Sequence, residues 1–483
     1  MTADKDIIRR MFDPEDFRRT GHTLIDLLAD ELRLAMAGER PVLNWQQPET
    51  ADLTWQAPLP TRPTLDSTGL TNRLRKEVLP GMLAVHHPHN MGHQVASPLP
   101  IAALCDLVAA LSNQAMAVYE TGPSATMLER QVIRWLDILI GWPAQGDNGI
   151  LTSGGAQANL TALLAARQHA RDCWRRGMPA RPSLRILASE HCHYSIARAA
   201  GIMGLGTDAV IRIRTDTAGR MLPADIARAH AECTGRRETV MAVVANAGST
   251  ATGSVDPLQE IGVYCRRNNI WLHVDGAHGA SALLSKRYRG LLRGLELADS
   301  IVWDGHKLLY MPATVSAVLF RSASDSYLAF AQQASYLFHG GTPETEGYNV
   351  SYRTLECTKR MMALKLWTAF SLYGTQGLAA LIDEAFDKAR LFADMLQART
   401  DFELLMPPHT NIVCFRHLAA GLSDGALERH QMDVRKRLVE SGQFHLTQVE
   451  LHGRLWLRTT LMNPFTQQSH LQTLIDHVSS HSA

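Results

Sequence analysis

A lysine and an aspartate follow apolar runs in the middle of the sequence, where they could share one reactive site. Lys307 ends the segment DSIVWDGHK, next to His306. A lysine whose charge is disfavoured by burial or by a cationic neighbour can act as a Schiff-base nucleophile. Asp275 ends the run IWLHVD, and a carboxylate there could keep a heteroaromatic ring nitrogen protonated. For either residue alone, a solvated lysine and a helix N-cap aspartate are the commoner outcomes.

Two further segments add groups that could hold a flat, phosphorylated ligand. The segment TSGGAQANLTALLAAR at 152–167 combines a strand end, the pair Gly154 and Gly155, and the start of a helix. Glycine lets backbone N–H groups approach an anion, and a helix N-terminus attracts negative charge. His193, in SEHCHYS, follows another apolar run and could stack on a flat ring. A plain glycine turn and a hydrogen-bonded turn histidine are the alternatives.

The order of these groups indicates a known cofactor. An anion loop, a stacking histidine, an acid and a His-Lys pair are the parts that bind pyridoxal phosphate. With them the chain resembles the group II pyridoxal-phosphate decarboxylases, which include the aromatic amino-acid, glutamate and cysteine-sulfinate decarboxylases. The resemblance runs from HHPHNMGHQ at 86–94 to LRTTLMNPFT at 457–466 and depends most on SGGAQAN, HYS, DGAHG and DGHK.

The resemblance implies roles for individual residues around the cofactor. Lys307 is expected to form the Schiff base, Asp275 to face the pyridine nitrogen, His193 to stack on the ring and Ala277 to pack under its other face. The complete predicted cofactor-binding set is Ser153, Gly154, Gly155, Ala156, His193, Asn246, Thr250, Asp275, Ala277, Asp304, His306 and Lys307.

One position departs from the family pattern. Relatives usually carry Ser or Thr where this chain has Ala156. More of the phosphate binding should therefore fall to backbone amides and to Ser153 or His306.

The resemblance also implies the reaction, α-decarboxylation of an L-amino acid to the amine and carbon dioxide by a homodimer with its active site at the subunit interface. Tyr336, in QQASYLFHGG, matches the tyrosine that protonates Cα from a mobile loop. The following residues 339–343 favour a loop over a packed aromatic in a helix. The predicted catalytic residues are Lys307, Tyr336, His193 and Asp275.

Substrate residues are expected in two segments. The first is HPHNMGHQ, which offers His87, His89, Asn90, His93 and Gln94. This segment has none of the aromatic residues of aromatic-specific relatives, so it favours a polar or acidic substrate. In the second, TKRMMALKLW, Lys359 and Arg360 match the place where acid-specific relatives often carry an arginine. A lysine lacks the two-pronged guanidinium fork.

Several alternatives therefore stay open. On the same scaffold they are decarboxylation of diaminobutyrate or another basic amino acid, oxidative deamination and transamination. A non-catalytic binding protein is disfavoured, because His193, Asp275 and Lys307 are all present.

The elements that must carry these residues fall into three predicted zones. Residues 1–85 form a helical arm for dimerisation, with a helical pattern at 14–36. Residues 86–345 form the large cofactor-binding α/β domain. Its strand-like runs, several of them apolar on both faces, are RILASE, TVMAVVANAG, IWLHVDGA, SIVWDGHK and SAVLFR. Residues 346–483 start with a long helix at 354–374 and continue as a small α+β domain. The resemblance implies a type I pyridoxal-phosphate fold, like aspartate aminotransferase, with a mainly parallel seven-stranded sheet.

Composition sets the outer limits. The chain has 483 residues, 46% of them apolar, and a net charge of +1, so we expect no nucleic-acid or membrane partner. No apolar stretch reaches the roughly 18 residues of a membrane span, and the charged first residues do not read as a signal peptide. The seven cysteines form no C-x-x-C pair, so no metal site is predicted. We expect a cytoplasmic enzyme.

Overall fold

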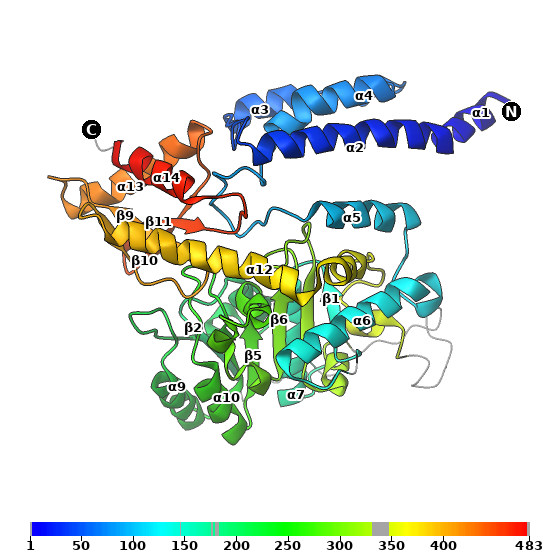
Figure 1. Cartoon of the computed structure of the whole chain (residues 1–483). Coiled ribbons are helices and arrows are strands. Elements are labelled where there is room, and N and C mark those ends of the chain that lie inside the picture. Colours follow the sequence, from blue (N-terminus) through cyan, green and yellow to red (C-terminus); the bar gives the residue numbers. More distant parts are fainter. Residues whose placement is uncertain (1, 145, 175–176, 179–182, 331–346, 481–483) are drawn as a thin grey trace. The chain divides into compact units, whose positions relative to one another are not determined.

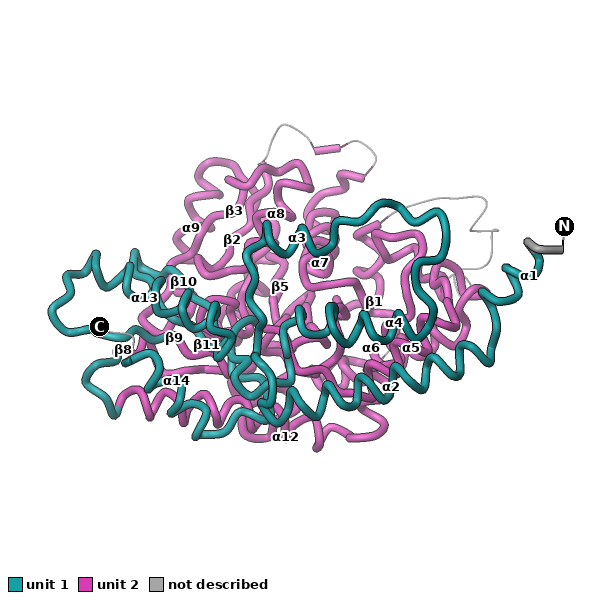
Figure 2. The backbone as a smooth tube through the Cα atoms, turned by 90° about the horizontal axis from the view of Figure 1, so that it is seen from above, with its two compact units in different colours: residues 1–93, 398–403, 415–483 teal, residues 94–397, 404–414 magenta. Residues whose placement is uncertain are grey.

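The computed structural model describes residues 2–144, 146–174, 177–178, 183–330 and 347–480. The chain divides into two compact units, coloured separately in Figure 2. Unit 1 contains residues 1–93, 398–403 and 415–483, and unit 2 contains residues 94–397 and 404–414.

Unit 2 is built on a seven-stranded, mainly parallel sheet, which confirms the predicted fold class. In spatial order its strands are β1 (Gly149–Thr152), β7 (Ser316–Phe320), β6 (Ser300–Asp304), β5 (Trp271–Asp275), β4 (Thr239–Asn246), β2 (Leu184–Ser189) and β3 (Val210–Ile213). The pairs from β6 to β3 are parallel, and β7 runs antiparallel to both of its neighbours. Every residue of β5, β6 and β7 is buried, as expected for strands covered on both faces.

Helices cover both faces of this sheet because the chain reverses direction across it. It moves outward through α7 (Gly155–Ala170) and α8 (Ser195–Ile202) to the edge strand β3. It then returns through α9 (Pro223–Gly235) and α10 (Leu258–Arg267), which lie together in Figure 1. Since parallel crossovers are right-handed, α7 and α8 cover one face, and α9 and α10 cover the other.

The carboxyl ends of the parallel strands gather the residues that the sequence singled out. Asn246 and Asp275 end the paired strands β4 and β5 and are partners in register. Asp304 ends β6, and Gly155 begins α7 directly after β1. Ligands of open α/β sheets bind at this edge, so the fold brings the predicted site together.

The long helix differs from its predicted bounds. It is α12, Ala363–Gln397, so residues 354–362 of the predicted helix lie before it. It packs against α5 (Pro100–Ser112) and α6 (Pro123–Ile140). These contacts make α12 part of unit 2, whereas the sequence analysis grouped it with the small domain after residue 345.

Unit 1 joins the two ends of the chain. Its N-terminal part contains α1 (Thr2–Met11), α2 (Pro14–Met36), α3 (Pro48–Trp55) and α4 (Ser67–Arg73). The helix predicted at 14–36 is confirmed as α2, and Asp13 caps it by accepting the Glu15 N–H at 3.0 Å. The following segment pairs with the C-terminal part, since Val42 N donates to Gly442 O at 2.9 Å. Within unit 1, the predicted arm is therefore hydrogen-bonded to the C-terminal part of the same chain.

The C-terminal part of the chain has the α+β organisation that the sequence predicted. Its four-stranded sheet has the order β10 (Thr447–Leu451), β11 (Arg454–Thr460), β9 (Ile412–His417) and β8 (Phe402–Leu404). The accompanying helices are α13 (Asp424–Glu440) and α14 (Gln468–Ser480). Within the described ranges, no helix has both the length and the apolarity to cross a bilayer.

Candidate active site

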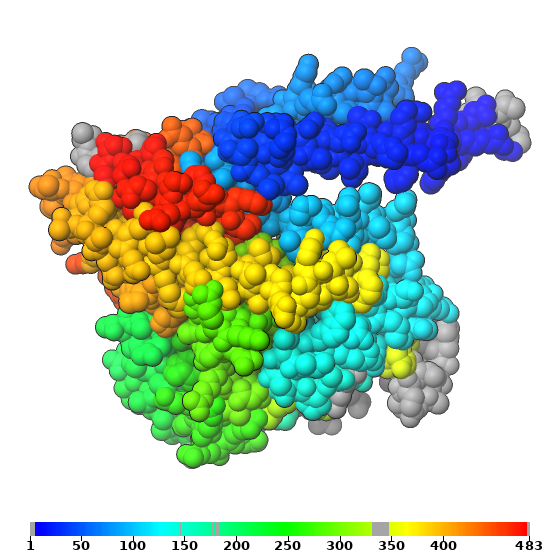
Figure 3. Space-filling model, viewed as in Figure 1, coloured from blue at the N-terminus to red at the C-terminus, as the bar shows by residue number. Residues whose placement is uncertain are grey.

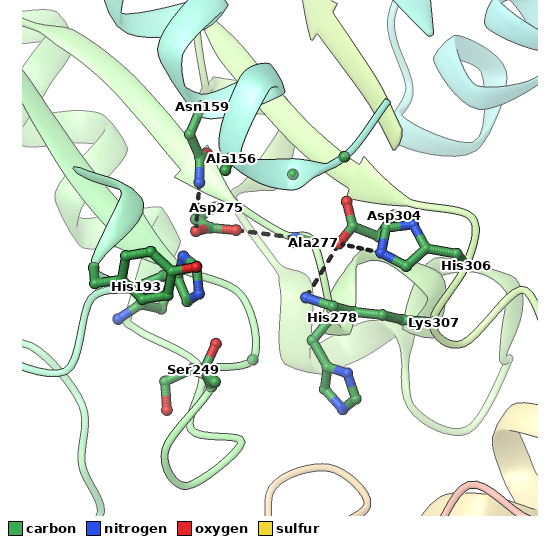
Figure 4. Close-up of a pocket in the computed structure, with 16 residues that line it drawn as sticks. Ala156, Asn159, His193, Ser249, Asp275, Ala277, His278, Asp304, His306 and Lys307 are labelled. Atoms are coloured by element: carbon green, nitrogen blue, oxygen red, sulfur yellow. Dashed lines mark hydrogen bonds and ion pairs between the residues drawn. The ribbon is translucent and has the colours of Figure 1, made fainter. Parts of the chain in front are cut away.

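A cavity of about 240 Å³ lies at the carboxyl edge of the large sheet (Figure 4). Five segments of unit 2 line it. They contribute Gly154, Gly155, Ala156 and Asn159; His193 and Tyr194; Asn246, Gly248, Ser249 and Thr250; Asp275, Ala277 and His278; and Asp304, His306 and Lys307. Eleven of the twelve predicted cofactor residues are in this lining, with Ser153 as the exception.

Asp275 is held as a hydrogen-bond acceptor at the end of β5. Its side chain is buried, with the residue 8% exposed. Asn159 Nδ2 donates to its Oδ2 at 3.0 Å, and the backbone N–H of Ala277 donates to its Oδ1 at 3.2 Å. Two N–H donors stabilise an ionised carboxylate, so this group is suited to hold a proton on a ligand nitrogen.

Lys307 approaches the same cavity from the turn after β6. Its Nζ lies 3.1 Å from Oδ2 of the buried Asp304, and Nε2 of His306 lies 3.5 Å from the same oxygen. Figure 4 shows these three side chains grouped beside the carboxylate of Asp275. Asp304 is itself fixed by the hydroxyl of Ser316, which donates to Oδ1. The amine is therefore positioned by a buried acid while it faces the cavity.

His193 enters from the segment between β2 and α8. Its Nδ1 lies 2.8 Å from Ser195 Oγ, which fixes the ring plane. Burial lowers the pKa of His193 below its usual value, against the opposing effect of Asp275. A neutral imidazole presents a flat face without a competing positive charge, as stacking on a protonated ring requires.

The start of α7 forms an anion cradle. Gly154 has a φ of +149°, a conformation that L side chains rarely adopt. A Cβ on Gly155 would lie 3.0 Å from Oδ1 of Asp304, so the backbone here approaches the acid more closely than a side chain would allow. Gly154, Gly155 and Ala156 line the cavity at the start of α7, and the unpaired N–H groups at a helix N-terminus can bind phosphate.

The loop after β4 brings two hydroxyl groups to the cavity, of which Thr250 was predicted from the sequence and Ser249 was not. Ser249 and Thr250 both line the cavity, whereas the exposed Ser153 donates to Gln157 outside it. Gly248 makes this path possible, because it has a φ of +92° and its Cβ would lie 2.9 Å from Gly279 N. Ala156 has no hydroxyl group, but the hydroxyl groups of Ser249 and Thr250 line the same cavity.

The donor set fits pyridoxal phosphate. Asn246 is 2% exposed and lines the cavity, and its Nδ2 has no hydrogen-bond partner in the described part of the chain. Its backbone N–H donates to the buried Asp256 at 2.6 Å, so the side chain is held in place. An unsatisfied buried donor indicates a missing polar ligand. An amine, a carboxylate and an anion cradle surround the same space.

The predicted substrate residues are not in this lining. His87 and His89 line a second cavity, of about 540 Å³, within unit 1, together with His470 and His477. Asn90 Oδ1 lies 2.9 Å from Nδ1 of His445. The rings of His93 and His445 have centroids 5.6 Å apart. Gln94, the first residue of unit 2, is half-buried.

Lys359 and Arg360 also lie outside the lining. Lys359 is buried and pairs with Glu129, and Arg360 donates to Asp106 O at 3.0 Å. Tyr336 lies outside the described residues.

Sequence reasoning missed five lining residues, Asn159, Tyr194, Gly248, Ser249 and His278. All five lie inside segments that it had already selected. Asn159 stands four positions after Gly155 on α7, so helix periodicity places it on the face of the first glycine. The spacing within SGGAQAN could have identified it.

Comparison with known proteins identifies the family of this chain. The family model described as pyridoxal-dependent decarboxylase conserved domain matches residues 56–418. The chain belongs to this family. It is therefore a pyridoxal-phosphate-dependent amino-acid decarboxylase, a carboxy-lyase.

The similarity to individual relatives extends over most of this chain. The chain is 32% identical over 473 residues to cysteine sulfinic acid decarboxylase of Rattus norvegicus, covering 93% of each chain. It is 33% identical to L-2,4-diaminobutyrate decarboxylase of Rhizobium meliloti, covering 82% of this chain and 78% of that one. The crystal structure of mouse CSAD matches with a TM-score of 0.91 and 29% identity, over 97% and 99% of the two chains.

Proposed function

We propose that this decarboxylase removes the α-carboxylate of a polar L-amino acid, with acidic side chains favoured over aromatic ones, and that Lys307 carries the cofactor. The observation that supports the site assignment most strongly is the common cavity of Lys307, Asp275 and the N-terminus of α7. The amine, the carboxylate and the helix N-terminus match the aldehyde, the ring nitrogen and the phosphate of pyridoxal phosphate, respectively.

Each group has a part in the proposed reaction. Bound pyridoxal phosphate supplies a protonated ring that accepts the electron pair left by departing carbon dioxide. Asp275 holds the proton on the ring nitrogen by charge and by a hydrogen bond. Lys307 would provide the amine that holds the cofactor. Asp304, 3.1 Å from Nζ, would hold a proton on that amine when it is not bonded to the cofactor.

The polarity of the lining supports a polar substrate. Tyr194 supplies the one phenol ring in the described lining, beside the amide of Asn246, the hydroxyl of Ser249 and the imidazole of His278. An indole or phenol substrate would leave such groups without partners, which costs binding free energy. The names of the relatives, cysteine sulfinic acid decarboxylase and acidic amino acid decarboxylase GADL1 of Mus musculus, agree with an acidic side chain.

A second candidate substrate is L-2,4-diaminobutyrate. Lys359, the residue expected to clamp a substrate carboxylate, is committed to Glu129. The described lining carries no arginine, and its one lysine is Lys307, which is assigned to the cofactor. A substrate with a cationic side chain needs no lysine to bind that side chain. The similarity to L-2,4-diaminobutyrate decarboxylase also supports diaminobutyrate as the substrate.

A substrate panel tests the proposed preference for a polar substrate and shows whether an acidic amino acid or 2,4-diaminobutyrate is the better one. The enzyme is incubated with cysteine sulfinate, aspartate, glutamate, 2,4-diaminobutyrate, tryptophan and tyrosine, and the amine product and carbon dioxide are measured. We expect a kcat/KM at least tenfold higher for one polar substrate than for either aromatic one. Preference for an aromatic amino acid would contradict the proposal.

Borohydride reduction tests the role of Lys307. Reduction of the loaded enzyme followed by peptide mapping should locate the cofactor adduct on the peptide that contains Lys307, and Lys307→Ala should lose both the adduct and the activity. Lys286→Ala, at another described lysine outside the lining, is the control. An adduct on a different peptide would contradict the assignment.

We propose that the active unit is a homodimer. Large apolar side chains of α1, α2 and the turn between them, blue in Figure 3, are unusually exposed, with Met11 at 75%, Phe12 at 81% and Phe17 at 52%. Such patches mark interaction sites. Light scattering should report a dimer for the full chain and a monomer for the double variant Phe12→Asp/Phe17→Asp, with His22→Asp as control. A wild-type monomer would contradict this.

Two predictions rest on the sequence alone. The proton-donor role of Tyr336 stays a prediction, and Tyr336→Phe should divert the product away from the amine. The cytoplasmic location also stays a prediction.

A further inference from the structure

A buried chain of hydrogen bonds connects the two sides of the cavity through Asn159. This asparagine is 1% exposed, and its Nδ2 lies 3.0 Å from Asp275 Oδ2 and 3.0 Å from Ser195 Oγ. On its other side, Asn159 Oδ1 lies 2.9 Å from Nε2 of His273. His273 is fully buried on β5, two positions before Asp275. The amide of Asn159 therefore contacts two residues of β5 and the first residue of α8.

Chemistry fixes the direction of this chain. An ionised carboxylate can only accept hydrogen bonds, so the amide NH₂ of Asn159 must face Asp275. The amide oxygen then faces His273, which requires a proton on Nε2. The Nδ1 of His273 lies 2.9 Å from Ser300 Oγ, which accepts the indole N–H of Trp271 at 2.8 Å. The hydroxyl proton of Ser300 is thus left to donate to Nδ1.

Burial keeps this histidine neutral. Desolvation lowers the pKa of His273 below its usual value, although the charge of Asp275 acts in the opposite sense. Neutral imidazole has one donor and one acceptor nitrogen, and both nitrogens of His273 have partners of the matching kind. The side-chain partners therefore favour the Nε2–H tautomer, while a backbone hydrogen bond with Ser300 acts to raise the pKa of the ring.

The second branch fixes His193 in the same way. Ser195 Oγ accepts from Asn159, so its own proton is free to donate to His193 Nδ1 at 2.8 Å. The backbone N–H of Ser195 points at the same nitrogen at 3.3 Å. With two donors facing Nδ1, neutral His193 carries its proton on Nε2. The two cavity groups are thus set by one asparagine.

We propose that His273 and Asn159 are positioning residues that together hold Asp275 as an ionised acceptor for the ring nitrogen and His193 as its Nε2–H tautomer. His273 acts from outside the cavity and orients the amide of Asn159. The inference rests on the proposed pairing of Asp275 with the ring nitrogen. Nothing in it requires His273 to touch cofactor or substrate.

The protonation of the ring nitrogen can be measured directly. The enzyme is loaded with pyridoxal phosphate labelled with ¹⁵N in the ring, and solid-state NMR reports whether this nitrogen is protonated. We expect the protonated signal in the wild type, its loss in Asp275→Asn, and a clear shift toward the unprotonated position in His273→Leu. His273→Gln, whose Nε2–H can replace that of the imidazole, should restore the wild-type signal.

Controls separate this role from general stability. His417→Leu removes another buried, hydrogen-bonded histidine, located in unit 1, and should leave the ring signal unchanged. We also expect kcat to fall by about 10- to 100-fold in His273→Leu, as for other outer partners of a site residue, with little change in KM. A wild-type ring signal in a folded His273→Leu enzyme would overturn the proposal.

A measurement on the wild type alone covers the case in which His273→Leu does not fold. Labelling with ¹⁵N-histidine should show His273 protonated at Nε2 and bare at Nδ1, and the reverse tautomer or a doubly protonated ring would overturn the inference. The failure of the underlying assignment looks different. If Asp275→Asn leaves the ring nitrogen protonated, the pairing of Asp275 is wrong; if Asp275→Asn abolishes the signal and His273→Leu does not, the positioning role is wrong.

Discussion

Lys359 and Glu129 form an ion pair inside unit 2, where both side chains are almost inaccessible to water. Glu129 Oε1 also accepts the backbone N–H of Leu151 at 3.0 Å, and Lys359 Nζ donates to the carbonyl of the same residue at 2.7 Å. The pair therefore holds both polar backbone groups of one residue of β1. Because β1 leads into the anion cradle, Lys359 supports the site from outside it.

Replacing Lys359 with Met should reduce stability and leave substrate binding largely unchanged. It leaves a buried carboxylate without its partner, which costs about 3–5 kcal/mol in the free energy of unfolding. Urea denaturation and steady-state kinetics measure the two effects. The double variant Lys359→Met/Glu129→Gln should recover most of the loss. A large rise in KM for acidic substrates with unchanged stability would instead support the substrate clamp.

Asp256 gives the fold a dependence on pH. It is fully buried and accepts the backbone N–H groups of Asn246 and Met221, and burial raises its pKa to about 7. In the unfolded chain the same carboxyl ionises near its usual pKa of about 3.9. The folded state therefore binds this proton more tightly, and the resulting stability is lost as pH rises toward 7.

Asp256→Asn should remove this pH dependence. Between pH 5 and pH 8, we expect the wild type to lose about 2–3 kcal/mol of unfolding free energy relative to the variant. Denaturant titration at both pH values measures the difference, and the exposed Asp30→Asn serves as control. Parallel pH profiles for wild type and Asp256→Asn would show that the buried carboxyl does not titrate in this range.

At the scale of elements, the loops after the parallel strands decide the shape of the cavity. The loop between β4 and α10 turns at Gly248 and presses its backbone against Gly279. Ser249 then hydrogen-bonds to Thr252 and Ser254 through their hydroxyls at 2.9 and 3.0 Å. This tight turn carries Ser249 and Thr250 to the cavity that the start of α7 also lines, so a change in its backbone is expected to alter the shape of this candidate cofactor site.

Gly248→Ala should therefore weaken both the fold and cofactor binding. An L residue in the left-handed region costs about 1–2 kcal/mol, and the added Cβ would also meet the backbone N of Gly279 at 2.9 Å. Thermal unfolding and a spectroscopic titration of the cofactor-free enzyme with pyridoxal phosphate measure the two effects. Gly290→Ala, whose Cβ would meet nothing within 4 Å, should be close to neutral. Equal behaviour of the two variants would count against the close-approach argument.

At the scale of the whole molecule, the candidate site lies within unit 2, but its residues come from many segments of that unit. Its lining spans residues 154–307 and draws on the turns after β1, β2, β4, β5 and β6. A ligand bound there connects segments that are far apart in sequence. The cofactor should consequently stabilise unit 2 as a body.

Removing the cofactor should lower stability in a way that can be located. A ligand present at 100 times its Kd stabilises the folded state by about 2.7 kcal/mol. Hydrogen exchange should show added protection on loading at 154–159, 246–250 and 304–307, and little change in β10 and β11. Uniform protection of both units, or none, would contradict a site confined to unit 2.

The sequence by itself indicated the decarboxylase family, its cofactor and the buried strands of the large sheet. Buried strands were readable as apolar runs, and SGGAQAN, HYS, DGAHG and DGHK follow such runs in the order that a pyridoxal-phosphate site needs. These signals are local, because a strand pattern and the residue that follows it are contiguous. The parallel sheet then brings these residues together, because the carboxyl ends of its strands lie at one edge whatever their separation along the chain.

Only the tertiary structure decided which partner each polar group has. Lys359 meets Glu129 across 230 residues, Asn159 lies between Asp275 and Ser195, and Ser249 faces the cavity while Ser153 does not. The two termini join in unit 1, and α12 packs into unit 2. The physical reason is that a buried polar group takes the partner that chain packing brings within about 3 Å, and that distance depends on strand order and helix packing, which no local pattern encodes.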